Sequence, residues 1–392
     1  MSTSYSPRMV TDGLQLYYDV NNIKSYPGEP TTNIVTYPDW SNISDHVVGT
    51  ASRTKESYLD IGDGITIVQA TTSDIISVTV SVNDSTPTSG VEQTWSADLY
   101  CTSTGSKIKS QIIVYVDGVK NWLQNDGSWT TSVNEYGYMF SPTSANQWHR
   151  WSKTITLPVG TLTGLAFGSF YRTTGNFTLK IANVQIEEKS HATQFVNGTR
   201  STTDGLKDLS GQANHADLAN AGFDSNALLD FNNSNLNYIP ITTLLNAEAI
   251  GASTTKTISF WFNPGVLSSY MAFSTGQTGD DRIYMWTSSN LHTWRVGNYT
   301  TTSGHSTLTV DTWYYTTLVI DGNNLYVYLN GQLDYSGTYA SFTTAHYATL
   351  GRHGEAGAYY FNGKIDVVQI YTKALSAQEV LQNYNALKGR YI

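Results

Sequence analysis

The sequence is poor in cysteine, in charge and in long apolar runs. Cys101 is the only cysteine, so the chain can form neither an internal disulfide nor a thiolate metal cluster. No run approaches the roughly 18 apolar residues of a membrane-spanning helix, and the opening MSTSYSPRMV lacks the apolar core of an export signal. We therefore expect no membrane insertion and a fold stabilised by burial alone.

Charged residues are also scarce. They make up 14% of the chain, and the formal net charge is −9. Nucleic-acid binding needs clustered lysine and arginine to neutralise phosphates, and no basic run is present. Nucleic acid is therefore excluded as an expected partner.

The composition favours β-structure. The 392 residues are enough for two domains, aromatics reach 12%, and there are 27 tyrosines and 32 glycines. Aromatic residues fit pleated sheets and glycines fit tight turns. We expect an all-β protein.

Segments that alternate between apolar and polar residues recur along the chain. Strands are predicted at 108–116, 151–157, 177–186, 257–262, 314–320, 325–329 and 364–371. Short strands separated by turns are typical of β-sandwiches rather than βαβ units. Asp117-Gly118 and Asn330-Gly331 suit the positive φ angles of type I′ hairpin turns.

In the stretch LYVYLNG, period-2 alternation assigns a face to each side chain. Leu325, Val327 and Leu329 are expected in the core, with Tyr326 and Tyr328 on an opposite tyrosine surface.

One helix is expected near the end of the chain. Ser376 caps it, Glu379 completes a capping box, and Gly389 ends it. Its apolar stripe consists of Val380, Leu381, Tyr384 and Leu387.

From Leu229 onward, several landmarks follow one another in a specific order. They are Leu229-Asp230-Phe231, Thr257-Ile258-Ser259-Phe260-Trp261-Phe262, Asp311-Thr312-Trp313-Tyr314, Val327-Tyr328-Leu329-Asn330-Gly331 and Phe361-Asn362-Gly363-Lys364-Ile365-Asp366. This part resembles the laminin-G-like, concanavalin A-type jelly roll of bacterial and phage proteins. The resemblance places Trp261 and Trp313 in the core.

The start of that jelly roll lies far from the rest. Gly13-Leu14-Gln15-Leu16 and Pro27-Gly28 resemble its opening, while Asp208-Leu209-Ser210-Gly211 resembles what directly follows in single-piece versions. We therefore expect a flexible arm (1–8), a discontinuous jelly roll (9–32 plus 201–392) and a second jelly roll (33–200) inserted into it.

The inserted part resembles a carbohydrate-binding-module-like jelly roll. Its landmarks are Trp95 to Tyr100, Gln147 to Thr154 and Ile181 to Glu188, and the resemblance places Trp148 in the core. The closing phrase His191 to Arg200 resembles those of phage tail-fibre and other virion proteins.

The resemblance raises the question of glycan cleavage. Laminarinase-like relatives carry Glu-x-Asp-x-(x)-Glu on one strand, so that two carboxylates share a face. Here Lys364 stands at the nucleophile's position and Gln369 at the proton donor's, leaving Asp366 alone. An ammonium group and an amide cannot perform those roles, and the common hydrolase, zinc-protease and nucleotide-binding motifs are absent. No catalytic residue is predicted.

Neither a cofactor nor a metal is predicted. Asp230 or the pair Asp280-Asp281 could offer oxygen ligands to a calcium ion, but adjacent aspartates are common turn formers.

Sugar sites combine aromatic rings with hydrogen-bonding groups. The expected carbohydrate-binding residues are Trp122, Trp129, Tyr138, Trp286 and Trp294. The expected function is that of a non-enzymatic phage virion protein, a fibre or capsid decoration, that binds surface glycans. Its partners would be other virion proteins, cell-surface glycans and copies of itself, with assembly in the host cytoplasm. An extracellular polysaccharide-active glycoside hydrolase and a cellular lectin or adhesin are the alternatives.

Overall fold

The structure is a computed structural model of the whole chain. It describes residues 8–36, 47–49, 52–58, 62–69, 76–82, 89–102, 108–124, 126–132, 144–172, 177–223, 229–232, 234–241, 254–268, 270–275, 283–288, 290–297, 300–339, 348–354 and 358–392. These residues form antiparallel sheets and one short α-helix, so the expected all-β class is confirmed. Two compact units result: unit 1 comprises residues 1–30 and 201–392, and unit 2 comprises residues 31–200.

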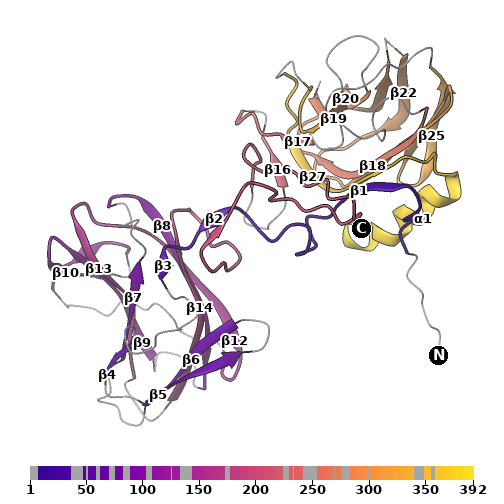
Figure 1. Cartoon of the computed structure of the whole chain (residues 1–392). Helices are drawn as coiled ribbons and strands as arrows, with labels where there is room; N and C mark the ends of the chain where they lie inside the picture. The colour runs from indigo at the N-terminus through magenta and orange to yellow at the C-terminus, as the bar shows by residue number, and fades with distance from the viewer. Residues whose placement is uncertain are drawn as a thin grey trace, which may run out of the picture. The chain divides into compact units, whose positions relative to one another are not determined.

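The described strands of unit 1 form two sheets, of which the larger, sheet A, has seven strands. In spatial order these are β1 (Leu14–Tyr18), β27 (Gly363–Tyr371), β18 (Thr255–Pro264), β23 (Tyr314–Asp321), β24 (Asn324–Leu329) and β25 (Gln332–Thr338), with β16 (Leu229–Phe231) also paired to β27. Figure 1 labels β1, β16, β18, β25 and β27 of this sheet. The first strand of the chain is thus hydrogen-bonded to the last.

The second sheet of unit 1, sheet G, has six strands. In spatial order they are β17 (Ile239–Ile241), β26 (Ala348–Leu350), β19 (Tyr270–Thr275), β20 (Ile283–Ser288), β21 (Leu291–Val296) and β22 (Thr300–Thr307). The two sheets enclose one hydrophobic core, to which sheet A contributes Phe260 and Val368 and sheet G contributes Phe273 and Met285. Most strands supply this core with alternate side chains, as in a β-sandwich, and β19 and β27 depart from strict alternation at their bulges.

The face of sheet A that points away from this core is covered as well. Tyr328 and Tyr371 pack there with Val10 and Val380, in a second apolar cluster. The expected tyrosine surface is therefore wrong: Tyr328 is buried and Tyr326 packs against the same cluster, because the start and end of the chain lie over them.

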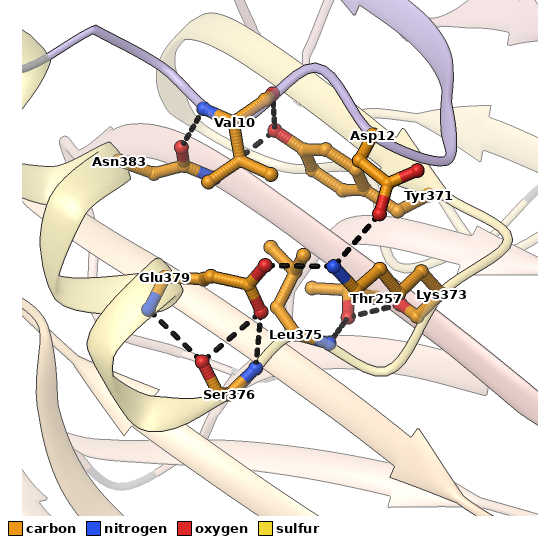
Figure 2. Close-up of polar contacts among 9 residues, drawn as sticks. All are labelled: Val10, Asp12, Thr257, Tyr371, Lys373, Leu375, Ser376, Glu379 and Asn383. Carbon is orange, nitrogen blue, oxygen red and sulfur yellow. Dashed lines mark hydrogen bonds and ion pairs between the residues drawn. The ribbon is translucent and has the colours of Figure 1, made fainter.

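Hydrogen bonds and ion pairs hold the start of the chain and the helix region near its end against this face of sheet A, as Figure 2 shows. The backbone N–H of Val10 donates to Oδ1 of Asn383 over 2.8 Å, and the hydroxyl of Tyr371 donates to the Val10 carbonyl over 3.1 Å. Lys373 contacts both Asp12 and Glu379, at 2.9 and 2.7 Å. Segments from the two ends of the sequence are thus held together on one side of unit 1.

The helix α1 (Ala377–Leu387) begins as the sequence predicts. Ser376 accepts from the backbone N–H of Glu379, whose side chain accepts from the backbone N–H of Ser376, so the capping box is confirmed. The predicted end at Gly389 and the predicted stripe need correction. A 3₁₀ turn, η5 (Lys388–Arg390), continues from the helix, and Leu381 remains 36% exposed beside the turn at Gly331.

Unit 2 is also built from antiparallel sheets. The larger sheet has seven strands, β11 (Trp129–Thr130), β10 (Val119–Leu123), β9 (Ile108–Val116), β13 (Leu162–Arg172), β7 (Ile76–Val82) and β3 (Val35–Thr36), with β4 (Val47–Gly49) paired to β7. Sheet E has five strands, β12 (Trp148–Thr156), β8 (Glu92–Cys101), β14 (Phe177–Glu187), β6 (Gly62–Gln69) and β5 (Ser52–Tyr58). The short strands β2 (Thr31–Thr32) and β15 (Thr199–Arg200) pair at the boundary of the unit.

The core of unit 2 lies between these sheets and contains Trp95, Leu99, Val114 and Ile181. The seven predicted strands all occur, with ends that move by at most a few residues. Both predicted hairpin turns are present, because Asp117, Gly118, Asn330 and Gly331 all have positive φ angles. Within the described part of the chain, no helix is long and apolar enough to cross a membrane.

Candidate functional site: an aromatic face on unit 1

Sheet G carries a group of aromatic and basic side chains on the face that points away from the core. We call this group, formed by Tyr284, Trp286, Arg295, His353 and Tyr359, the aromatic face. On β20 the neighbours Ile283 and Met285 enter the core. Period-2 alternation therefore turns Tyr284 and Trp286 away from the core. On that side Tyr284 is still only 3% exposed and Trp286 is partly buried.

The rings of this face lie in a row. Tyr284 and Trp286 stack with centroids 6.1 Å apart, and Trp286 and Tyr359 stack with centroids 6.5 Å apart. The imidazole of His353 meets Tyr284 and Tyr359 at 60°, with centroids 6.3 and 6.2 Å away. The row presents its most accessible ring at Tyr359, which is 50% exposed.

A cation lies over the same rings. The guanidinium carbon of Arg295, on the neighbouring strand β21, is 5.5 Å from the Tyr284 ring centroid and 5.8 Å from that of Trp286. Both distances allow a cation–π attraction. The face therefore combines flat apolar rings with a hydrogen-bond donor.

The loop between β26 and β27 contributes His353 and Tyr359. The hydroxyl of Ser274 donates to the Arg352 carbonyl over 2.9 Å and accepts from the Gly354 N–H over 2.7 Å. The Met271 N–H donates to the Tyr359 carbonyl over 3.0 Å. Strand β19 therefore fixes this loop over the edge of the face.

Tyr359 has an uncommon backbone conformation. Its φ angle is +55°, which is unfavourable for a bulky side chain. Strained residues of this kind persist where the surrounding structure holds them, and they concentrate at functional sites. The backbone thus presents the Tyr359 ring to solvent at a conformational cost.

A second basic residue lies beside the face. The guanidinium carbon of Arg352 is 3.5 Å from the Tyr238 ring centroid, and Nη1 donates to the Tyr360 hydroxyl over 3.4 Å. Sequence reasoning missed Tyr359, because only the folded loop brings its ring to Trp286.

The structure separates the two tryptophans predicted for unit 1. Trp286 belongs to the aromatic face, whereas Trp294 is fully buried among Phe260 and Phe273. Trp294 pairs with the core residue Met285, and cross-strand partners share a face. A buried indole offers no surface to a sugar, so the interpretation of Trp294 as a binding residue is wrong.

The candidates in unit 2 are separated too. Trp129 pairs with the core residue Leu123, and Trp122 pairs with Thr130, so the two indoles lie on opposite faces of their sheet. Trp129 packs against the core and donates from Nε1 to the Thr156 carbonyl over 2.8 Å. Trp122 lies under the ammonium of Lys120, 5.1 Å from it. Tyr138 lies outside the described residues. The two described residues form no joint site.

Trp148, expected in the core, is 38% exposed on β12. The expectation is wrong because Trp148 pairs with Tyr100, on the solvent side of sheet E. Trp261, expected in the core, is fully buried, but in a cluster on the face of sheet A that points away from the core between the sheets. Trp313, expected in the core as well, is only partly buried against that cluster.

The strand compared with catalytic strands is largely buried. Asp366 is 1% exposed and accepts from the Val20 N–H over 3.2 Å, from Asn21 Nδ2 and from the Tyr391 hydroxyl over 2.5 Å. Burial raises the pKa of Asp366 to about 6, although the Tyr391 hydrogen bond acts in the opposite direction. Gln369 is fully buried and accepts from the Tyr315 hydroxyl over 2.6 Å.

A network of buried polar side chains connects His292 on β21 with Thr316 on β23 and Asp334 on β25. His292 Nδ1 lies 2.9 Å from Oδ2 of Asp334, and His292 Nε2 lies 2.7 Å from the Thr316 hydroxyl. The Thr316 oxygen also accepts from Trp294 Nε1 over 2.8 Å. Burial would raise the pKa of Asp334, but hydrogen bonds from His292 and Ser306 lower it below its usual value. Since His292 and Thr316 are fully buried, this hydrogen-bonded network links β21 to β23 and β25 inside unit 1.

Among the described residues, no group of three or more histidine, cysteine, aspartate or glutamate side chains could hold a metal. Asp230 is described and half-buried, while Asp280 and Asp281 lie outside the described residues.

Comparison with known proteins adds a family match. Residues 234–381, less than half of the chain, match the family described as the concanavalin A-like lectin/glucanases superfamily. This segment includes all five residues of the aromatic face. No curated protein matches.

Several solved structures are similar. One describes ganglioside-dependent cell entry of botulinum neurotoxin type C (14% identity, 46% of this chain, 48% of that chain, TM-score 0.37). Another is domain 4 of AbnA, a GH43 extracellular arabinanase from Geobacillus stearothermophilus, with arabinotriose (19% identity, 47% and 95%, TM-score 0.37). A third is the binding domain of Paraclostridial Mosquitocidal Protein 1 (17% identity, 47% and 50%, TM-score 0.40). The chain spans about half the length of the neurotoxin structure.

Proposed function

We propose that this protein is a non-enzymatic carbohydrate-binding protein and that unit 1 binds glycans through its aromatic face. The observation that carries the proposal is the row of stacked rings ending at the exposed, strained Tyr359. Sugar rings bind with their C–H faces against aromatic rings and their hydroxyls on fixed polar groups. The lectin and glucanase family match over the same segment supports this assignment.

The glycan proposal is tested on an array of glycans with the wild-type chain and Tyr359→Ala. Loss of an exposed aromatic anchor is expected to weaken binding at least about tenfold. Tyr115→Ala is the matched control, since Tyr115 is 37% exposed on unit 2. Equal binding by wild type and Tyr359→Ala would remove the aromatic face from consideration.

We also propose that the protein binds glycans without cleaving them. Of the three positions compared with a glycanase strand, only Asp366 is acidic, and its carboxyl group is buried beneath Tyr391. Incubation of the protein with soluble polysaccharides is expected to release no reducing ends. Sugar release that disappears in Asp366→Asn would favour the alternative of a polysaccharide-active hydrolase.

We further propose that the protein belongs to a phage virion, as a fibre or capsid decoration, where it contacts other virion proteins and copies of itself. This part of the proposal rests on the resemblance of His191 to Arg200 to virion proteins. In unit 2 this phrase has local bonds: Arg200 donates to the Gln194 and Phe195 carbonyls over 2.9 and 3.1 Å. Mass spectrometry and immunogold labelling of purified particles test the placement. Absence from particles would leave a cellular lectin or adhesin.

A further inference from the structure

A row of side chains crosses three adjacent strands of sheet E in unit 2. Trp148 on β12 pairs with Tyr100 on β8, which pairs with Lys180 on β14. The ring centroids of Trp148 and Tyr100 are 5.7 Å apart, and the Lys180 ammonium is 5.6 Å from the Tyr100 ring centroid. The row therefore forms a continuous aromatic strip that ends in a cation.

This row lies on the solvent side of the sheet. Along β8 the core residues Leu99 and Cys101 flank Tyr100 and are fully buried. Tyr100 therefore points away from the core. Trp148 is the most exposed tryptophan of the described residues, at 38%. Its exposure is notable because the apolar area of an indole normally favours burial.

A set of polar groups lies in the next row of the same sheet. Asp98 pairs with Arg150, and Nη1 of Arg150 lies 3.4 Å from Oδ1 of Asp98. The Arg150 guanidinium also donates to the Ser96 hydroxyl over 2.9 Å and to the Asn183 carbonyl over 3.0 Å. These bonds fix the guanidinium beside the aromatic row, while Asp98 and Arg150 keep 18% and 31% of their side chains exposed.

The backbone of β14 is distorted where it meets these groups. A bulge falls between Ala182 and Gln185, and Asn183 within it has a φ angle of +50°. Nδ2 of Asn183 donates to Oδ2 of Asp98 over 2.7 Å. Bulges commonly re-aim a side chain beside a functional site, and left-handed residues often mark such sites. The bulge brings an amide and a carboxylate together next to the rings.

We propose that this face, formed by Trp148, Tyr100, Lys180, Arg150, Asp98 and Asn183, binds an oligosaccharide independently of the aromatic face on unit 1. Strands in a sheet are about 4.8 Å apart, so three strands give a strip about 10 Å long, which extends beyond a single sugar ring. Ring faces of the ligand lie on Trp148 and Tyr100. Its hydroxyls donate to Asp98 and accept from Arg150, whose planar group suits two neighbouring oxygens.

The test uses the full chain and a panel of soluble polysaccharides (β-glucan, xylan, mannan, dextran and alginate) in native affinity gels. In a Tyr359→Ala background, which disables the aromatic face of unit 1, at least one polysaccharide is expected to retard the protein. Adding Trp148→Ala is expected to weaken that retardation at least tenfold, whereas Trp148→Phe keeps a ring and retains most of it. Adding Tyr115→Ala, an exposed ring on the other sheet of unit 2, is the matched control and leaves retardation unchanged.

Three outcomes would overturn the proposal. The first is that no polysaccharide of the panel retards the Tyr359→Ala chain, and the second is that adding Trp148→Ala leaves the retardation unchanged. The third is a lower oligomeric state of Trp148→Ala in light scattering, which would make this face a contact between copies of the chain. Oxidation by N-bromosuccinimide provides a second measurement without a variant. The retarding polysaccharide is expected to protect Trp148, and modification at an unchanged rate would contradict binding there. Because Tyr359→Ala is present throughout, failure here is distinguishable from failure of glycan binding by unit 1.

Discussion

The hydroxyl of Tyr391 donates to Oδ2 of Asp366 over 2.5 Å, while its ring stacks on Trp261 with centroids 4.0 Å apart. Beside it, Arg390 donates from Nη1 to both carboxylate oxygens of Asp19 at 2.8 Å. The last residues of the chain thus close over two buried carboxylates.

This arrangement makes the stability of unit 1 depend on pH. Burial raises the pKa of Asp366 from 3.8 to about 6 in the folded protein. Folding therefore favours the protonated carboxyl group of Asp366. Its contribution to the free energy of unfolding is fully present below about pH 3.8 and is lost as the pH rises through about 6. Roughly 3 kcal/mol is the size expected from a change of about two pKa units.

Denaturant unfolding of wild type and Asp366→Asn, at several pH values between about 4 and about 7, checks this dependence. The wild-type free energy of unfolding is expected to fall by roughly 3 kcal/mol relative to the variant over that range. Parallel pH curves for the two proteins would contradict it.

The capping box of α1 gives a second prediction. Ser376→Ala removes the oxygen that accepts from the Glu379 N–H, and it is expected to lower the free energy of unfolding by about 1 kcal/mol. Ser376→Asp keeps a capping oxygen and serves as the control. If both variants unfold at the same denaturant concentration, the cap does not contribute as the structure indicates.

The Thr316 hydroxyl gives a third prediction. Thr316→Val has nearly the same shape but leaves Trp294 Nε1 and His292 Nε2 without this partner. Two buried groups that lose a hydrogen bond are expected to destabilise the protein by roughly 2–4 kcal/mol in denaturant unfolding. Thr316→Ser retains the hydroxyl, so it should lose distinctly less. The opposite order would mean that packing of the methyl group outweighs the hydrogen bonds.

The interrupted arrangement of unit 1 gives a fourth prediction. A fragment of residues 203–392 lacks β1, whose Leu16 and Tyr18 are fully buried, and is expected to be less stable than the whole chain by more than about 3 kcal/mol. Thr31 and Arg200 are paired neighbours. Residues 1–30 joined to 201–392 through a short glycine-serine linker should therefore recover most of the loss. A fragment 203–392 as stable as the whole chain would contradict the insertion hypothesis.

Local features of the fold could be predicted from the sequence because their causes are local. A capping box depends on Ser376 and Glu379, three residues apart, and a type I′ turn depends on the adjacent residues Asn330 and Gly331. Period-2 alternation located the strands for the same reason. Helix ends and the exposure of Leu381 depended instead on how the helix lies on sheet A, which no local pattern records.

The candidate sites were harder to predict, because the face of a side chain depends on its strand partners. Trp286 and Trp294 look alike in sequence, yet the β20–β21 register pairs Trp294 with a core residue. Tyr359 reaches the aromatic face only through a loop held by Ser274 and Met271, which are distant in sequence. The exposure of Trp148 likewise follows from its pairing with Tyr100.

The pairing of β1 with β27 has a consequence for synthesis of the chain. Residues 31–200 contain all the strands of unit 2, so this unit can fold as soon as Arg200 has left the ribosome. Sheet A, in contrast, needs residues 363–371 before β1 acquires its partner. Domains generally fold as units during translation, and contacts between distant segments form slowly. During synthesis β1 therefore stays without its partner strand while the residues of unit 2 fold, and unit 1 is completed after unit 2.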